Sequence, residues 1–190
     1  MKILYVINQI SDWSGDSGLV WMSAQFFKKR GHEVTIATTD GNPFRDNEST
    51  IQYSKTIEKL SNSNNSFVMI NDVPIFPVHS VSSKFGMYSF NANKIAKKIV
   101  KNFDIIHIYS WYHHVGIEFF KAAKKYNIPL IFSAMGTLQD DAQSFYKIQK
   151  SIINLFFTKK IIDYASVLHS VGYSEIESYI KYGGKKEKII

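Results

Sequence analysis

The sequence contains no cysteine, which excludes a disulfide framework and a thiolate metal site and fits a reducing compartment such as the cytoplasm. It also lacks an apolar run of the roughly 18–20 residues that a membrane-spanning helix needs. The apolar opening, residues 1–7, is too short for a signal peptide and is followed by Asn8 and Asp12. We therefore expect a soluble, cytoplasmic protein.

The charge balance is basic. Lysine and arginine total 23 residues against 16 aspartates and glutamates, a formal net charge of +7. Lysines such as Lys94, Lys97, Lys98 and Lys101 recur at spacings of three and four, which predicts solvated helix faces. An anionic membrane or a phosphate-rich ligand is the alternative partner, whereas the scattering of these charges argues against nucleic acid.

Short apolar runs rich in β-branched residues alternate with segments of helical pattern. Residues 104–111 and 128–138 are two such runs separated by a helix-like segment, which is typical of a βαβ unit in a parallel sheet. The pattern predicts strands at 2–7, 33–39, 67–70, 73–78, 105–109, 130–133, 167–170 and from 188, and helices at 18–30, 89–101, 111–126, 142–164 and 174–181. Residues 40–66 are polar and predict a surface excursion. We expect one α/β domain with a parallel sheet.

Two local features sharpen this prediction. Leu19, Met22, Phe26 and Phe27 lie on one face of the first predicted helix, and Asn71-Asp72 is placed to turn a hairpin between the third and fourth strands.

Function is expected at the strand ends, because parallel sheets bind ligands outside the carboxyl ends of their strands. His107 alternates with apolar neighbours and is either a core histidine or a cleft residue. His113, at the start of a predicted helix, suits a surface or packing role better than a site role. Gly136 follows a strand and lets a ligand approach the backbone, although an ordinary strand exit is the alternative. The spacing of the histidines predicts no metal site.

The loop after the first strand is the natural phosphate site. Gly15 and Gly18 precede or open a helix whose N-terminal N–H groups favour an anion. The spacing is not the dinucleotide fingerprint, because the first glycine comes eight residues after Ile7. Asp40 stands where a ribose-binding acid would lie but is better explained as a turn former before Gly41. A nucleotide- or dinucleotide-binding protein stays open as a hypothesis.

The order of these segments resembles a known family. The segments are the glycine-containing first loop, Arg30-Gly31-His32-Glu33-Val34, Asp104-Ile-Ile-His107, the strand 128–133 closing on Gly136-Thr-Leu138, and residues 169–177. Together they resemble the N-terminal domain of GT-B-fold glycosyltransferases, in particular the retaining "group 1" family, family four. The resemblance implies that residues 1–190 form a Rossmann-like, acceptor-side domain with helices on both faces of its sheet. It further implies that a C-terminal nucleotide-sugar-binding domain is missing from a truncated chain, a gene fragment or one subunit of a split enzyme.

The resemblance also implies roles for residues. The donor phosphates would face Ser14, Gly15 and Asp16. The acceptor cleft would be lined by His107, Tyr109, Trp111, His113, Met135 and Gly136, although Trp111 also suits a core. Ser14-Gly15 stands where the family usually has two glycines, and Met135 where it often has a histidine. The nucleotide-sugar would be a substrate, and no cofactor or metal is expected.

The implied activity is transfer of a sugar from a nucleotide-sugar to a glycan or lipid-linked acceptor, in surface polysaccharide or glycoconjugate biosynthesis. The alternative is a non-catalytic binding or regulatory module. The expected partners are a sugar or glycolipid acceptor and a separate donor-binding domain or subunit, and not nucleic acid. Peripheral contact with the inner face of the cell membrane is a side hypothesis. The segment from Phe145 to Ile162 mixes apolar residues with Lys147, Lys150, Lys159 and Lys160, but burial in the core explains it better.

Overall fold

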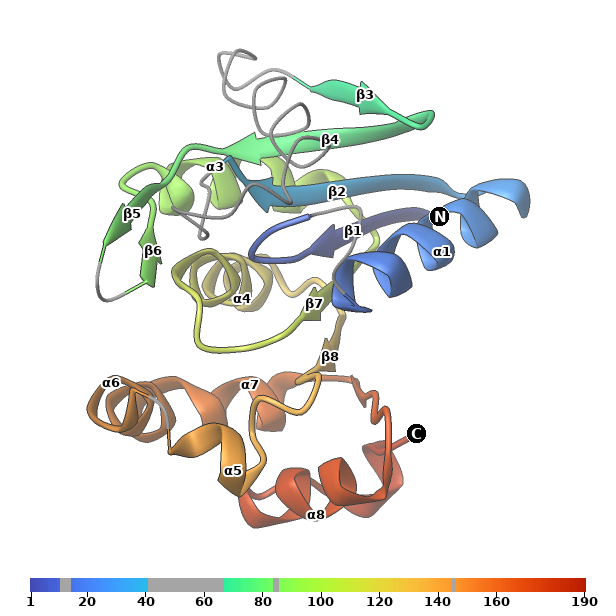
Figure 1. The fold of residues 1–190 in the computed structure, drawn as a ribbon. Coiled ribbons are helices and arrows are strands. Elements are labelled where there is room, and N and C mark those ends of the chain that lie inside the picture. Colours follow the sequence, from blue (N-terminus) through green and yellow to red (C-terminus); the bar gives the residue numbers. More distant parts are fainter. Residues whose placement is uncertain (11–14, 41–66, 84–85, 145) are drawn as a thin grey trace.

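The computed structural model describes residues 1–10, 15–40, 67–83, 86–144 and 146–190 (Figure 1). Within these residues, seven strands form one sheet in the order β3-β4-β2-β1-β7-β8-β9. The strands are β1 (Lys2–Val6), β2 (Glu33–Thr39), β3 (Val68–Ile70), β4 (Val73–Val78), β7 (Ile105–Tyr109), β8 (Leu130–Ser133) and β9 (Val167–Leu168). All neighbours pair in parallel except β3 with β4. The predicted parallel α/β sheet is confirmed.

The helices are α1 (Gly15–Lys29), α3 (Ala92–Ile99), α4 (His114–Tyr126), α5 (Asp140–Gln143), α6 (Lys147–Ile153), α7 (Lys159–Tyr164) and α8 (Tyr173–Lys181). They cover both faces of the sheet (Figure 1). On one face, Val20 and Ala24 of α1 share a core cluster with Ile3 and Tyr5. On the other, α3, α4 and α7 pack in a second cluster that includes Leu4 of the same strand. Successive side chains of β1 therefore point to opposite faces of the sheet and pack into two different cores.

The predicted hairpin between β3 and β4 is confirmed. Asn71 and Asp72 both have positive φ, 47° and 61°, as a two-residue turn of this type requires. A second, two-stranded antiparallel sheet, β5 (Val81–Ser83) with β6 (Gly86–Tyr88), was not predicted. At the other end of the chain the predicted last strand is a single parallel bridge between Leu168 and Ile189. Of the predicted excursion at 40–66, only Asp40 lies within the described residues.

Two predicted helices differ from the prediction. The helix predicted from Trp111 starts at His114, because Ser110 and Tyr112 adopt the left-handed conformation with φ of 61° and 63°. The single helix predicted over 142–164 is interrupted at Tyr146, with φ of 54°. A continuous run then extends from α6 through a π turn (Asn154–Thr158) to the end of α7.

The face that α1 buries also differs from the prediction. Leu19, Met22 and Phe26 are exposed, whereas Val20 and Ala24 are buried against the sheet. Small residues let the helix approach the strands closely, and Trp21 and Phe27 pack partly buried against the same core cluster. None of the helices in the described segments is both long and apolar enough to cross a bilayer.

Candidate functional site

A polar hollow of about 240 Å³ lies at the carboxyl ends of β1 and β7. The residues that line it follow these two strands or begin α1. They are Ile7, Asn8, Gln9, Asp16, Ser110, Trp111, Tyr112 and His113. This strand-tip hollow lies where parallel sheets bind ligands.

Asp16 and Ser110 join α1 to the segment after β7 across this hollow. The Ser110 hydroxyl donates to Oδ2 of Asp16 over 2.7 Å. Asp16 lies in the first turn of α1, where the partial positive charge of the helix N-terminus stabilises a carboxylate. A β-carbon added at Gly15 or Gly18 would meet no atom within 4 Å, so the space in front of both is open among the described residues. Ser14 lies outside the described residues.

His113 caps α4 from the floor of the hollow. Its Nδ1 accepts the Gly116 N–H over 3.0 Å, and its Nε2–H donates to the Tyr109 carbonyl over 3.2 Å. A β-carbon on Gly116 would lie 2.7 Å from the ring, so the glycine makes room for it. Burial lowers the pKa of His113 to about 4. The imidazole is therefore neutral at pH 7, with its proton on Nε2.

His107 belongs to a buried polar row across three strands. Its ring stacks on Tyr109 with centroids 4.0 Å apart. Its Nε2 lies 2.7 Å from Oγ of Ser133, which lies 2.8 Å from Nδ1 of His169. Burial, and secondarily the His169 ring, lowers the pKa of His107 to about 3. The Ser133 hydroxyl donates to one imidazole and accepts from the other. The three side chains therefore satisfy one another's hydrogen bonds.

The turn after β8 is fastened by a carboxylate that the sequence analysis did not single out. Met135 and Gly136 have φ of 55° and 74°. The Gly136 N–H donates to Oε1 of Glu175 over 2.7 Å, and the Val171 N–H donates to Oε2 over 2.9 Å. Glu175, in the first turn of α8, is fully buried. Glu175 thus fixes the position of the loop after β8 relative to the loop after β9.

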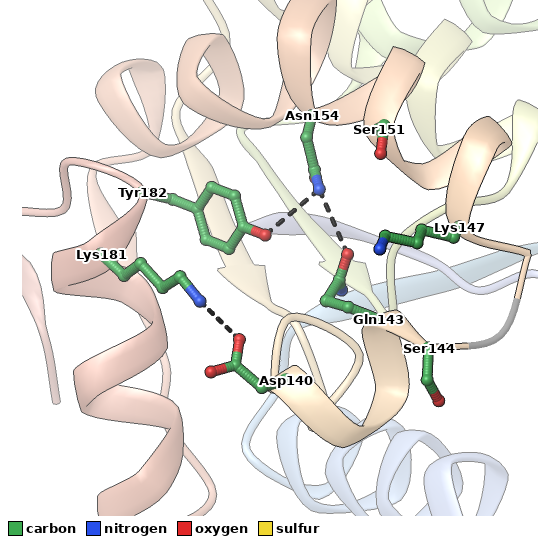
Figure 2. Close-up of a pocket in the computed structure, with 8 residues that line it drawn as sticks. All are labelled: Asp140, Gln143, Ser144, Lys147, Ser151, Asn154, Lys181 and Tyr182. Atoms are coloured by element: carbon green, nitrogen blue, oxygen red, sulfur yellow. Dashed lines mark hydrogen bonds and ion pairs between the residues drawn. The ribbon is translucent and has the colours of Figure 1, made fainter.

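A second and larger hollow, of about 590 Å³, lies between α5, α6 and α8 (Figure 2). Polar side chains converge on it, and Lys147 points into it from α6. The lining residues are Asp140, Gln143, Ser144, Lys147, Ser151, Asn154, Lys181 and Tyr182. None of them was predicted as a site residue. Asn154 did carry a signal, since it is a lone amide between Ile152-Ile153 and Leu155-Phe156.

Asn154 is the centre of the hydrogen bonds under this second hollow. Its Nδ2 donates to Gln143 Oε1 over 3.2 Å and to the Tyr182 hydroxyl over 3.1 Å. Its Oδ1 accepts from the Tyr112 hydroxyl over 2.8 Å and from Thr158 over 2.7 Å. Burial raises the pKa of Tyr112, which keeps its phenol protonated as a donor. Because Tyr112 also lines the strand-tip hollow, this network connects the two hollows.

An ion pair closes one side of the second hollow. Lys181 Nζ lies 2.5 Å from Asp140 Oδ1, and both side chains are exposed to solvent (Figure 2). One carboxylate, two amides, three hydroxyls and two ammonium groups thus line one open space. Such a lining suits a ligand rich in hydroxyl groups, because each hydroxyl both donates and accepts a hydrogen bond.

The structure brings some of the predicted site residues together and separates others. Trp111 and His113 share the strand-tip hollow with Asp16. Trp111 is nevertheless buried, and its Nε1–H donates to Thr158 over 2.8 Å. His107 and Tyr109 are buried beneath the strand tips. Met135 and Gly136 form the separate turn after β8.

Asp40 has a structural role of its own. Its buried carboxylate accepts the Ser80 N–H over 2.7 Å and lies 2.7 Å from Nδ1 of His79. These bonds tie the end of β2 to the end of β4 and occupy the oxygens that a ribose would need, whereas the turn predicted before Gly41 lies outside the described residues. In the described part of the chain, no group of three or more histidine, aspartate or glutamate residues is placed to hold a metal ion.

Comparison with solved structures shows the same fold. Anabaena HepE, solved with UDP and glucose, is 14% identical with a TM-score of 0.58, and the match covers 100% of this chain and 43% of HepE. S. aureus MnaA, solved with UDP, is 9% identical with a TM-score of 0.58, over 100% of this chain and 44% of MnaA. The chain therefore spans less than half the length of these proteins.

The search of curated proteins returned no match. The sequence profile of Glycosyltransferase Family 4 matches residues 19–190, which is most of the chain. The matched range includes every residue that lines the second hollow and residues 110–113 of the strand-tip hollow, whereas residues 7–9 and Asp16 precede it. With the GT-B-type sheet and helices described above, this match identifies the chain as a member of Glycosyltransferase Family 4.

Proposed function

We propose that this chain is the N-terminal, acceptor-side half of a glycosyltransferase that transfers a sugar from a nucleotide-sugar to a glycan or lipid-linked acceptor. The observation that carries the proposal is the family match over residues 19–190, combined with two connected polar hollows beside the strand ends. We assign the reaction to surface polysaccharide or glycoconjugate biosynthesis on the cytoplasmic side of the membrane.

The strand-tip hollow is the proposed donor-facing part. The open backbone at Gly15 and the N-terminus of α1 would face the donor diphosphate, and the helix N–H groups would stabilise the charge that builds on the leaving group. Ser14 belongs to the same proposal. The Asp16 carboxylate would repel a phosphate at close range, so we assign it to a sugar hydroxyl, in exchange for the bond it now accepts from Ser110.

The acceptor is proposed to lie between the two hollows. Of the residues predicted for its cleft, Trp111 and His113 line the strand-tip hollow, and Met135 and Gly136 form the partly exposed turn after β8. His107 and Tyr109 would act from beneath by fixing the strand ends. Tyr112, Gln143 and Asn154 extend the same polar surface into the second hollow.

The donor nucleotide is proposed to bind a second domain, on the same polypeptide or on a partner subunit. Support comes from length, because this chain covers 43% of HepE, a protein solved with UDP and glucose. On this proposal the 190-residue chain alone transfers little or no sugar. The test is an assay of nucleotide release from a panel of UDP- and GDP-sugars. Robust turnover by the purified chain with no partner present would contradict the proposal.

A second candidate is a non-catalytic binding or regulatory module that keeps the fold. Met135 favours it, because a thioether donates no hydrogen bond and this residue packs against the core cluster around Ile3 and Tyr5. The DNA downstream of codon 190 distinguishes the two. A reading frame for a nucleotide-sugar-binding domain supports the transferase, and its absence from the surrounding genes supports the binding module.

A further inference from the structure

The helix run from Lys147 to Tyr164 presents an apolar stripe to solvent. Ile148 is 79% exposed, Ile152 52%, Leu155 76% and Phe156 50%. These four residues, which we call the apolar face, recur at spacings of four and three and so lie on one side of the run. The sequence favoured burial of this segment, and the structure shows the opposite for the apolar face.

The other side of the run is what attaches it to the domain. Thr158, Ile161 and Ile162 are buried there, and Asn154 bonds to Tyr112 and Tyr182. A helix held by one face with four large apolar residues on the other is not an ordinary solvent-facing helix, which would carry polar residues outside. Contiguous exposed apolar patches of this kind mark binding surfaces.

Charge on the run indicates what covers the apolar face. From Tyr146 to Tyr164 the sequence holds four lysines, 147, 150, 159 and 160, and one acidic residue, Asp163. Lys147, Lys159 and Lys160 are exposed and lie at the two ends of the apolar face. Apolar side chains flanked by lysines are the pattern of a helix that lies in the plane of an anionic membrane surface.

We propose that the apolar face docks on the surface of an anionic lipid bilayer, with Lys159 and Lys160 contacting the lipid headgroups. Ile148, Ile152, Leu155 and Phe156 enter the boundary between headgroups and acyl chains. The axis of the run then lies parallel to the membrane, because its opposite side remains packed on the domain. The site is peripheral and involves no membrane-spanning segment of the described chain.

Docking in this orientation has a consequence for the second hollow. Lys147 and Ser151 line that hollow and lie on the same helix as Ile148 and Ile152 (Figure 2). The opening would therefore lie beside the lipid surface. This step rests on the proposed transferase function, and it favours an acceptor whose sugar or phosphate enters the hollow while its lipid tail stays in the bilayer.

The test is co-sedimentation of the 190-residue chain with vesicles of phosphatidylcholine alone or mixed with phosphatidylglycerol. We expect binding to the anionic vesicles, little binding to the neutral ones, and release as salt is raised. Ile148→Gln with Leu155→Gln should lower binding by roughly tenfold or more, since each removes an apolar side chain from the interface. Lys159→Gln with Lys160→Gln should lower it by a similar factor.

A matched control is Met69→Gln with Phe90→Gln, which changes two exposed apolar residues outside the run and should leave binding unchanged. Circular dichroism confirms that each variant is folded. Equal binding to both vesicles, or equal loss in the control, would overturn the proposal. So would a dimer that Ile148→Gln with Leu155→Gln dissociates while vesicles are not bound, because the face would then join two copies. No sugar enters this assay, so its failure leaves the transferase proposal to its own test.

Discussion

Substitution of Glu175 tests directly whether this carboxylate stabilises the loops after β8 and β9. Its two carboxylate oxygens accept the N–H groups of Gly136 and Val171, at 2.7 and 2.9 Å, and its side chain is fully buried. In Glu175→Ala both N–H groups lose their partner. Leaving such a donor unsatisfied costs about 1–3 kcal/mol when it is buried. Both donors here are partly reached by solvent, so we expect a total loss of roughly 2–4 kcal/mol.

The measurement is urea unfolding at pH 7, with thermal melting as a second readout. For a domain of this size, the expected loss corresponds to a melting temperature lower by roughly 4–16 °C. Glu175→Gln keeps one acceptor oxygen and should fall between the wild type and Glu175→Ala. Glu177→Ala, on the exposed side of the same helix, is the matched control and should stay within about 0.5 kcal/mol of the wild type. A Glu175→Ala protein as stable as this control would refute the reasoning.

Three further predictions concern the hollows. Burial lowers the pKa of His113 to about 4, below its unfolded value of about 6.5, so the unfolded state binds more protons between these values and stability falls as pH drops from 6.5 toward 4. In His113→Asn, which can still cap α4, urea unfolding at pH 7 and pH 4.5 should differ less than in the wild type, and an equally large difference would contradict this. Gly18→Ala meets no atom within 4 Å and should raise stability by roughly 0.5–1 kcal/mol, so a lower melting temperature would contradict the open geometry. Asn154→Leu leaves the Tyr112 and Thr158 hydroxyls without their acceptor and should cost roughly 1–3 kcal/mol in thermal unfolding, and an unchanged melting temperature would contradict the network.

The strands were predictable because the sheet is buried on both faces. A strand of this kind needs a short apolar run whatever its neighbours are, and β2, β4, β7 and β8 have the predicted bounds. The hairpin at Asn71-Asp72 was predictable for a local reason too, since these residue types tolerate positive φ. Family membership followed from the order of several such segments.

The buried face of a helix and the conformation of a loop depend on tertiary contacts, which the hydrophobic pattern of the sequence does not reveal. Leu19, Met22 and Phe26 of α1 are exposed, whereas Val20 and Ala24 are buried, and Trp21 and Phe27 pack partly buried against the same core cluster. Ser110, Tyr112, Met135 and Tyr146 adopt left-handed conformations without being glycine, and each follows a strand end or begins a helix near the hollows. Backbone strain of this kind concentrates at functional sites and has no marker in residue type.

The second hollow was missed for the same reason. Gln143, Asn154 and Tyr182 come from three helices and meet through side-chain hydrogen bonds. Because these residues are far apart in the sequence, their hydrogen-bond network cannot be predicted from it. The lone amide of Asn154 in an apolar run was the available signal, and a buried amide of this kind requires partners.

The most direct test of the central claim measures sugar transfer from nucleotide-sugars by the 190-residue chain alone and by the same chain combined with the polypeptide encoded immediately downstream. An acceptor-side half of a Family 4 glycosyltransferase should release little or no nucleotide by itself and should release it with sustained turnover in the combined sample. Sustained turnover by the chain alone would contradict the claim that it supplies only the acceptor side.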